Sequence, residues 1–153
     1  MDKNPVASVP LDSGVPLPVV RTGDASRISN RFGEELTSMG WVPIPQSLLR
    51  NWRKLPGDLD PTDILLLSLL IAYQRSDGSY KPARIRMLAV QMGMGDRAVR
   101  KRVKKLRELG YFNQEREPGK TAIYKLEPLY ERLIVAQKNY QEERGRSDDK
   151  ADS

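Results

Sequence analysis

Basic side chains are concentrated in one part of this chain, residues 81–125. That stretch holds 13 Lys and Arg against 4 Asp and Glu, although the formal net charge of the whole chain is only +6. The density is highest over residues 97–107, where seven basic residues occur and no acidic one. Cations packed this closely repel one another and destabilise the segment unless an anion neutralises them. The pattern therefore favours a surface that binds nucleic acid over an ordinary solvated helix face.

The same stretch carries apolar residues at the spacing of a helix, which we expect over residues 96–109. Val99, Val103 and Leu106 lie at i, i+4 and i+7 and form one buried stripe. Gly110 is typical of a helix end. Arg and Lys can donate to the O6 and N7 atoms of guanine or pair with phosphate. The basic residues opposite the stripe are Arg97, Arg100, Lys101 and Lys104, and those nearer its flanks are Lys105 and Arg107.

Two further helices must position this one. Asp60 and Pro61 are typical of a helix start, and the apolar run over residues 64–72 indicates a helix central to the core. Pro82 opens a second helix, which ends at Gly93, because access to positive φ suits a tight turn there. After the basic helix, YFNQER and TAIYKL flank the turn sequence EPGK and predict a two-stranded hairpin.

The N-terminal part of the chain divides into a tail and an arm. Residues 1–40, with scattered Pro, Gly, Ser and Asp, are expected to form a mostly disordered tail with a weak helix over 27–39. Residues 41–52 are too apolar to remain in solvent. We expect them to pack on the core as an arm, with a short helix that starts at Pro45.

A stripe of apolar residues follows the C-terminal helix, which we expect over 127–143, before a disordered polar tail over 144–153. The stripe residues fall at i, i+4, i+7 and i+11 and are Leu129, Leu133, Ala136 and Tyr140. Two copies paired through this stripe would hold two DNA-binding helices about one turn of DNA, roughly 34 Å, apart. The alternative is that the helix folds back onto residues 41–52 of its own chain. Of the two, we expect the homodimer.

Helix, helix, short turn, helix and hairpin is the order of a winged helix-turn-helix, a mainly α fold with a small β-hairpin wing. The stretches LDPTDILLLSLL and PARIRMLAVQMGMGDRAVRKRVKKLRELGYF, with the hairpin after them, resemble the winged-helix domains of small prokaryotic transcription regulators. They resemble the domains of plasmid and phage replication proteins more closely still. The resemblance covers residues 41–126. It implies a helix that enters the major groove of duplex DNA and a wing that touches the minor groove or the backbone.

The resemblance also implies roles for single residues. Base edges would be contacted by four residues of the basic helix, Arg97, Ala98, Arg100 and Lys101. The phosphate backbone would be contacted by Lys104, Lys105, Arg107, Arg84 and Arg86, and the tip of the wing is flanked by Arg116 and Lys120. The chain departs from the family at two positions. Gly95 and Asp96 stand where the family usually has a Ser or Thr cap, and Ala98 replaces a residue with a hydroxyl group.

Three aromatic residues near the hairpin allow either a binding role or a structural one. Tyr111, Phe112 and Tyr124 could stack on exposed bases, as in proteins that bind single strands. Phe112 and Tyr124 lie on the expected strands beside the core, however. We therefore expect at least these two rings to be buried.

The composition excludes several kinds of chemistry. The chain has no Cys and no His, so it offers no disulfide, no Cys or His metal site, no thiol nucleophile and no imidazole base. No apolar run approaches the roughly 18 residues of a membrane span, and the first residues lack the pattern of a secretory signal. We expect a cytoplasmic, nucleoid- or plasmid-associated protein of a prokaryote that needs neither cofactor nor metal.

Together, these observations predict a non-enzymatic protein that binds double-stranded DNA in a sequence-specific manner. It would act in transcription regulation or in plasmid or phage replication and maintenance. Two alternatives stay open: an adaptor or RNA-binding protein that uses the same basic face, and a nuclease. The nuclease is the weaker alternative, since the basic domain lacks His and a clustered pair of acidic residues.

Overall fold

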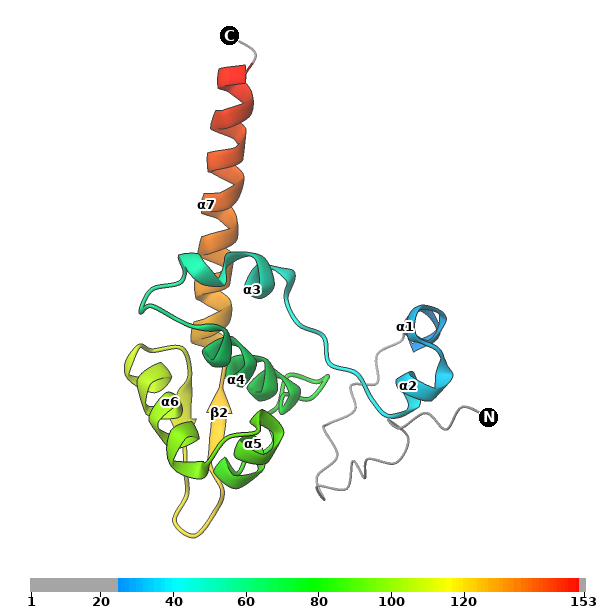
Figure 1. Cartoon of the computed structure of the whole chain (residues 1–153), viewed down its shortest axis with the longest axis vertical. Coiled ribbons are helices and arrows are strands. Elements are labelled where there is room, and N and C mark those ends of the chain that lie inside the picture. Colours follow the sequence, from blue (N-terminus) through cyan, green and yellow to red (C-terminus); the bar gives the residue numbers. More distant parts are fainter. Residues whose placement is uncertain (1–24, 152–153) are drawn as a thin grey trace.

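The computed structural model describes residues 25–151 of the chain. Within this range the elements are α1 (Ala25–Phe32), α2 (Glu34–Ser38), α3 (Gln46–Asn51), a 3-10 turn (Trp52–Lys54), α4 (Pro61–Ala72), α5 (Ile85–Met92), α6 (Asp96–Glu108), β1 (Asn113–Glu115), β2 (Ile123–Lys125) and α7 (Glu127–Ala151). The described part is mainly helical with a small antiparallel sheet of β1 and β2 (Figure 1). The expected fold class is confirmed at that level. Residues 1–24 of the expected tail lie outside the described range.

Helix α4 begins where the sequence predicts and lies in the core. The Asp60 carboxylate accepts a hydrogen bond from the backbone N–H of Asp63 (2.8 Å), and the Asp63 carboxylate accepts one from the N–H of Asp60 (3.1 Å). Pro61 occupies the first helical position. This reciprocal cap satisfies backbone donors that a helix start leaves free, so it fixes where α4 begins.

Helix α5 begins later than Pro82, where the sequence predicts its start. The backbone N–H of Ala83 donates instead to the carbonyl of Ala122 beside β2 (3.0 Å). This bond holds the chain extended against the hairpin, and therefore the helix cannot start at the proline. α5 ends as predicted at Gly93, whose φ of 66° permits the tight turn into α6.

Helix α6 packs its predicted stripe into the core, because Val99, Val103 and Leu106 are all buried. Gly95 stands at the N-cap position and Asp96 is the first helical residue. No side-chain cap is present at this end. Asp96 therefore does not replace the Ser or Thr cap, and the first backbone N–H groups of α6 have no side-chain acceptor at this exposed end.

The end of α6 turns the chain back toward the core. Gly110 adopts a φ of 77°, a conformation that a side chain would strain. The N–H of Tyr111 donates to the carbonyl of Leu106 (3.0 Å), and the N–H of Gly110 donates to that of Arg107 (3.0 Å). This pair of bonds is the Schellman arrangement that ends many helices at a glycine. The helix therefore ends at Glu108, one residue before the predicted end at residue 109.

Strands β1 and β2 pair with Gln114 opposite Tyr124. The rings of Phe112 and Tyr124 meet edge to face, with centroids 5.2 Å apart. Tyr111, Phe112 and Tyr124 are each at most 3% exposed. The structural role expected for Phe112 and Tyr124 is confirmed and Tyr111 shares it, so none of the three rings is free to stack on a base.

The apolar stripe of α7 is covered by α3 of the same chain. Leu129, Leu133 and Ala136 are buried, and the hydroxyl of Ser47 on α3 donates to the carbonyl of Leu133 (3.1 Å). Further along, the Nζ atom of Lys54 lies 5.0 Å from the ring centroid of Tyr140. The expectation of an arm over residues 41–52 is confirmed. Folding back onto the arm, the alternative to pairing between two copies, therefore covers Leu129, Leu133 and Ala136 within the chain, while Ile134 and Val135 beside them stay exposed. The homodimer stays a prediction.

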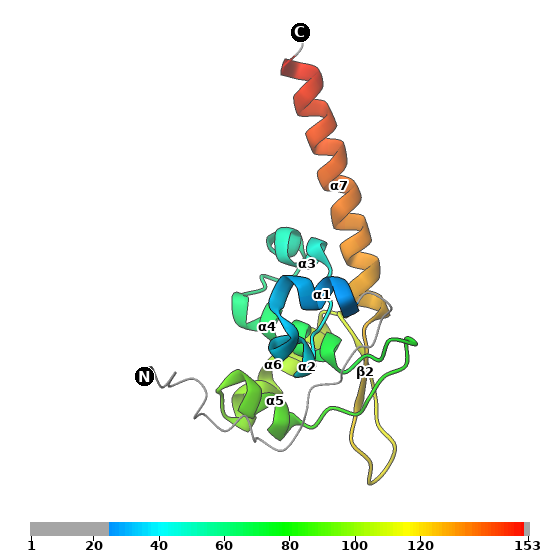
Figure 2. The same ribbon diagram turned by 90° about the vertical axis from the view of Figure 1, so that its right-hand side faces the viewer.

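Helix α7 also continues past its expected end near residue 143 and runs to Ala151. Lys54 forms an ion pair with Glu143 (3.0 Å), and the hydroxyl of Ser147 donates to the carbonyl of Glu143 (3.0 Å). No proline occurs over residues 144–151, and Arg144, Arg146, Lys150 and Ala151 are good helix formers, so the helix continues despite Gly145. Figures 1 and 2 both show the last part of α7 projecting from the body.

Two short helices, α1 and α2, form where the sequence predicts one weak helix over 27–39, and they lie to one side of the body in Figure 1. Phe32, Leu36 and Met39 in this region are each more than half exposed. No helix in the described part of the chain is both long enough and apolar enough to cross a bilayer.

Candidate nucleic-acid interface

The outward face of α6, opposite its buried stripe, carries Arg97 and Lys101. Both side chains are exposed, and neither forms a hydrogen bond or an ion pair within residues 25–151. Both lie in the N-terminal half of the helix, as the sequence predicts. Ala98 is exposed beside them. This end of α6 therefore offers two free cations to an incoming molecule.

One flank of α6 forms a wall of a groove of about 630 Å³, which we call the basic groove. Its other walls are the start of α5 and the β1–β2 hairpin. Seven cations line it, namely Arg84 and Arg86 near the start of α5, Arg100, Lys104 and Arg107 of α6, and Arg116 and Lys120 of the hairpin. Asp96 is the one acidic residue among the described residues that line it. Three separate segments thus bring their positive charges to one concave surface.

The charges in the basic groove act together on the buried ring of Tyr124. Burial raises the pKa of the Tyr124 hydroxyl, and the positive charges of Arg107, Arg116 and Arg100 oppose that rise. Guanidinium groups from α6 and from the hairpin therefore lie close enough to influence one phenol. Like charges gathered in a concave surface create a positive potential that attracts anions.

Several groove cations have partners, but these contacts are exposed. Arg107 donates to Oε1 of Gln114 (2.9 Å), and Nζ of Lys104 lies 4.0 Å from a carboxylate oxygen of Glu108. Lys120 forms an ion pair with Glu117 at the tip of the hairpin. Exposed ion pairs contribute only about 0–1 kcal/mol. A phosphate group can therefore displace them at little cost.

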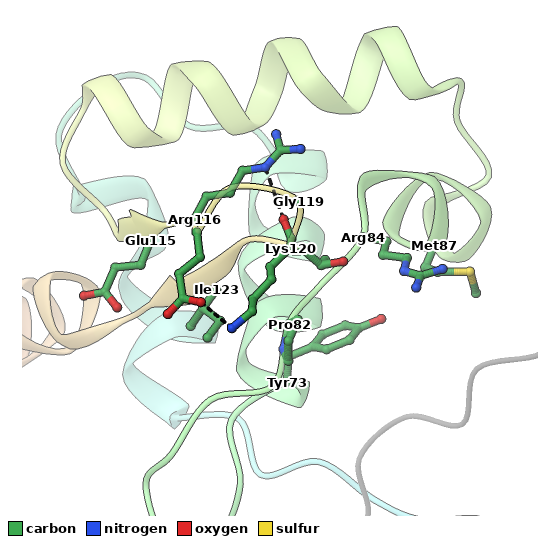
Figure 3. A pocket seen from close by; sticks show the side chains of 11 residues that line it. Tyr73, Pro82, Arg84, Met87, Glu115, Arg116, Gly119, Lys120 and Ile123 are labelled. Atoms are coloured by element: carbon green, nitrogen blue, oxygen red, sulfur yellow. Dashed lines mark hydrogen bonds and ion pairs between the residues drawn. The ribbon is translucent and has the colours of Figure 1, made fainter.

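The opposite side of the hairpin borders a second hollow, of about 790 Å³ (Figure 3). Arg116 and Lys120 line it as well, and in Figure 3 Arg116 reaches from the hairpin toward α6. Glu115 and Glu117 line this hollow but not the basic groove. The acidic side chains of the hairpin thus line the hollow and not the groove, so the charged residues of the groove are cations with the single exception of Asp96.

The other flank of α6 faces the start of α4 and is neutralised within the protein. Nη1 of Arg102 lies 2.8 Å from both carboxylate oxygens of Asp60 and 3.0 Å from Oδ1 of Asp63. Nζ of Lys105 lies 2.6 Å from Oδ2 of Asp63. Lys105 is therefore held in an internal ion pair. The sequence predicts a phosphate contact for Lys105, whereas in the structure its charge has a buried partner.

Asp63 is the residue whose importance the sequence reasoning missed. From the sequence, Asp60 is expected to cap α4 and Asp63 to place a favourable charge in its first turn. Both residues do fill those roles. A signal was present, however. An acidic residue in a helix that is apolar nearly all round must be buried, and a buried carboxylate needs cations beside it.

Apart from Lys105, the predicted cations fall on two adjoining surfaces. Those expected at the backbone or wing line the basic groove, as does Arg100, whereas Arg97 and Lys101 occupy the outward face. Within residues 25–151 no group of acidic side chains could hold a metal ion. Comparison of the chain with family models, with curated proteins and with solved structures finds no match.

Proposed function

We propose that the protein binds double-stranded DNA in a sequence-specific manner. The basic groove carries the proposal, since seven cations from three segments line one concave surface with a single acid among them. Duplex DNA carries one negative charge per roughly 1.7 Å of its axis. Release of its counterions upon pairing with Lys and Arg drives association. Such a lining suits a phosphate backbone better than a neutral ligand.

In this proposal α4, α5 and α6 form the core of a winged helix-turn-helix domain, and the β1–β2 hairpin is its wing. The N-terminal half of α6 would enter the major groove, where Arg97 and Lys101 would donate to base edges. Arg100 would join them from the wall of the basic groove. Ala98 would contact a thymine methyl group. The other groove cations would pair with phosphates and set the register of the protein on the duplex.

The biological role that we propose is transcription regulation or the replication and maintenance of a plasmid or phage. Each of these roles needs a protein that recognises a defined DNA site. The division of cations between an outward face and a groove supports such recognition, because base contacts and phosphate contacts have different requirements.

Selection of bound duplexes from a random pool tests the proposal. We expect one short sequence to be enriched, with an affinity at least about 1,000-fold above that of the unselected pool at 0.15 M salt. A palindromic site would indicate two copies on one duplex, and a single half-site would indicate a monomer. Equal binding of all duplexes and of heparin would contradict sequence recognition.

Competition identifies the class of partner. Single-stranded DNA and duplex RNA of the selected sequence are added to the protein bound to its selected duplex. We expect neither to compete as well as the DNA duplex itself. Better competition by RNA would instead support an RNA-binding role, and Mg²⁺-dependent loss of the duplex would support a nuclease.

A further inference from the structure

Asp63 is a charged residue in an unusual place. The exposed fraction of the residue is 0%, and all the other buried residues of the same helix are apolar. A carboxylate removed from water is strongly destabilising unless cations and hydrogen bonds surround it. The feature thus needs a reason other than the formation of a core, which an apolar residue would serve as well.

The partners of Asp63 come from α6, the helix that carries the candidate base contacts. Oδ1 lies 3.0 Å from Nη1 of Arg102, and Oδ2 lies 2.6 Å from Nζ of Lys105. Nη1 of Arg102 also donates to both carboxylate oxygens of Asp60 (2.8 Å each). Two side chains of α6, three residues apart, are therefore tied to the first turn of α4.

The cap of α4 needs an acceptor at Asp63, but neither the cap nor the stability of the core explains the two cations from α6. Replacement of a buried ion pair by well-packed apolar residues is often neutral or stabilising. Apolar contacts such as those of Val99 and Val103 are non-directional, and helices packed in this way vary in crossing angle by about 15–20°. Hydrogen-bonded ion pairs, in contrast, fix both distance and direction.

The ion pairs restrict the crossing angle of α6 against α4. Without them, the angle could vary by more than hydrogen bonds to base edges tolerate. α6 has 13 residues and is therefore about 20 Å long. A pivot of about 20° around its middle moves its N-terminal end by roughly 3 Å, more than the geometry of a hydrogen bond tolerates. Arg97 lies at that end.

We infer that Asp63 is a positioning residue for base recognition, which acts through Arg102 and Lys105 to fix the angle of α6 against α4. The inference rests on the proposed function. It assigns no DNA contact to Asp63 or to its two partners. It predicts that loss of the ion pairs lowers the discrimination between DNA sequences more than it lowers the affinity for DNA in general.

The experiment compares the full chain with two variants on the duplex selected from the random pool and on a scrambled duplex. Asp63→Asn keeps the shape and removes the charge. A triple variant, Asp63→Leu with Arg102→Met and Lys105→Met, replaces the whole cluster by apolar side chains, so that no buried charge is left unpaired. Controls with the same change in net charge are Glu142→Gln for the first variant and Arg50→Met for the second, at exposed positions on other helices.

We expect the ratio of the two affinities to fall at least tenfold in both variants and to stay unchanged in the controls. The triple variant should do so with a melting temperature close to that of the parent, because the apolar packing that replaces the buried charges offsets the loss of the Asp63 half of the cap of α4. Binding to the scrambled duplex should change no more than in the matched control. A lower ratio in a protein of full stability is an effect that a merely structural role would not produce.

Three results would overturn the inference. A triple variant that discriminates as well as the parent shows that the angle of α6 does not depend on the cluster. Failure of both variants to fold shows that the cluster serves folding itself. A parent that does not discriminate between duplexes removes the proposed function, and the inference with it, and this result is distinct from the other two.

Discussion

The two flanks of α6 carry the same kinds of residue in opposite settings. On the side of the hairpin, Arg100, Lys104 and Arg107 face the solvent of the basic groove. On the side of α4, Arg102 and Lys105 are partly buried and paired with acidic residues at the start of α4. Of the seven basic residues over 97–107, five therefore remain available to an anion.

The difference between the flanks shows how one helix can serve a core and a partner at once. Cations beside a buried carboxylate hold the helix in place, and they add nothing to the charge that an incoming molecule meets. Cations in the groove repel each other until an anion arrives. Sequence position alone does not separate the two groups, because they alternate along the same 13-residue helix.

The strongest test removes the groove flank of α6. Arg100→Ala, Lys104→Ala and Arg107→Ala together should lower the affinity for every duplex by about 100-fold or more at 0.15 M salt. The slope of log K against log salt concentration should become shallower by about 2 units, near 0.9 for each of the phosphate contacts of Lys104 and Arg107, and the loss of Arg100 should add a further loss on the selected duplex. Lys138→Ala, Arg144→Ala and Arg146→Ala on α7 make the same change in net charge. Equal losses from both triple variants would mean that only total charge matters.

Changes on the outward face should affect specificity. Arg97→Ala and Lys101→Ala should each weaken binding to the selected duplex by about 1–3 kcal/mol, if each makes a bidentate base contact. Binding to unselected duplexes should fall much less. Arg50→Ala, at an exposed position on α3, is the control. Equal losses on selected and unselected duplexes would assign these residues to the phosphates instead.

Neighbouring lysines on α6 provide the most direct contrast between the flanks. Lys105→Ala should lower the free energy of unfolding by about 1–3 kcal/mol, since Asp63 loses a charged partner, while the salt slope of DNA binding stays unchanged. Lys104→Ala should do the reverse, with stability within about 0.5 kcal/mol of the parent and a slope shallower by about 0.9. Urea unfolding and titrations over a range of salt concentrations measure both quantities. A shallower salt slope of DNA binding in Lys105→Ala would show instead that Lys105 contacts a phosphate.

The smallest expected effect is a dependence of stability on pH at the α4 flank. The hydrogen bond from Arg102, helped by the backbone N–H of Asp63, holds the pKa of Asp60 below its ordinary value of 3.8. A lowered carboxyl pKa stabilises the folded state above pH 3.8, and this stabilisation is lost as the pH falls through the lowered pKa. Asp60→Asn should therefore melt below the parent at pH 7, and the gap between the two melting temperatures should be narrower at pH 2.5. An equal gap at both pH values would show that the charge of Asp60 is not involved.

Local signals in the sequence predict much of the fold. Asp60 and Pro61 fix the start of α4, and Gly93 and Gly110 end α5 and α6, because caps and left-handed turns depend on residues that are close in sequence. The buried stripe of α6 follows from the helical period in the same way. These features need no knowledge of the remaining chain.

The differences that bear on the site concern contacts between distant segments. The start of α5 depends on the bond between Ala83 and Ala122, and the stripe of α7 is covered by an arm far away in the sequence. The role of Lys105 depends on Asp63, which belongs to another helix. Helical periodicity indicates that a side chain lies on a flank, but it does not indicate which segment faces that flank.

The direction of α7 bears on how the protein can be handled in binding measurements. Its 25 residues span about 37 Å, and its free end and the tip of the hairpin lie at opposite ends of the molecule in Figure 1. A sensor chip that captures the chain through a tag at the end of α7 would hold the body away from the chip by a stiff rod. The basic groove would then face the flowing duplex. A tag on the hairpin would place the groove against the chip and obstruct the surface under study.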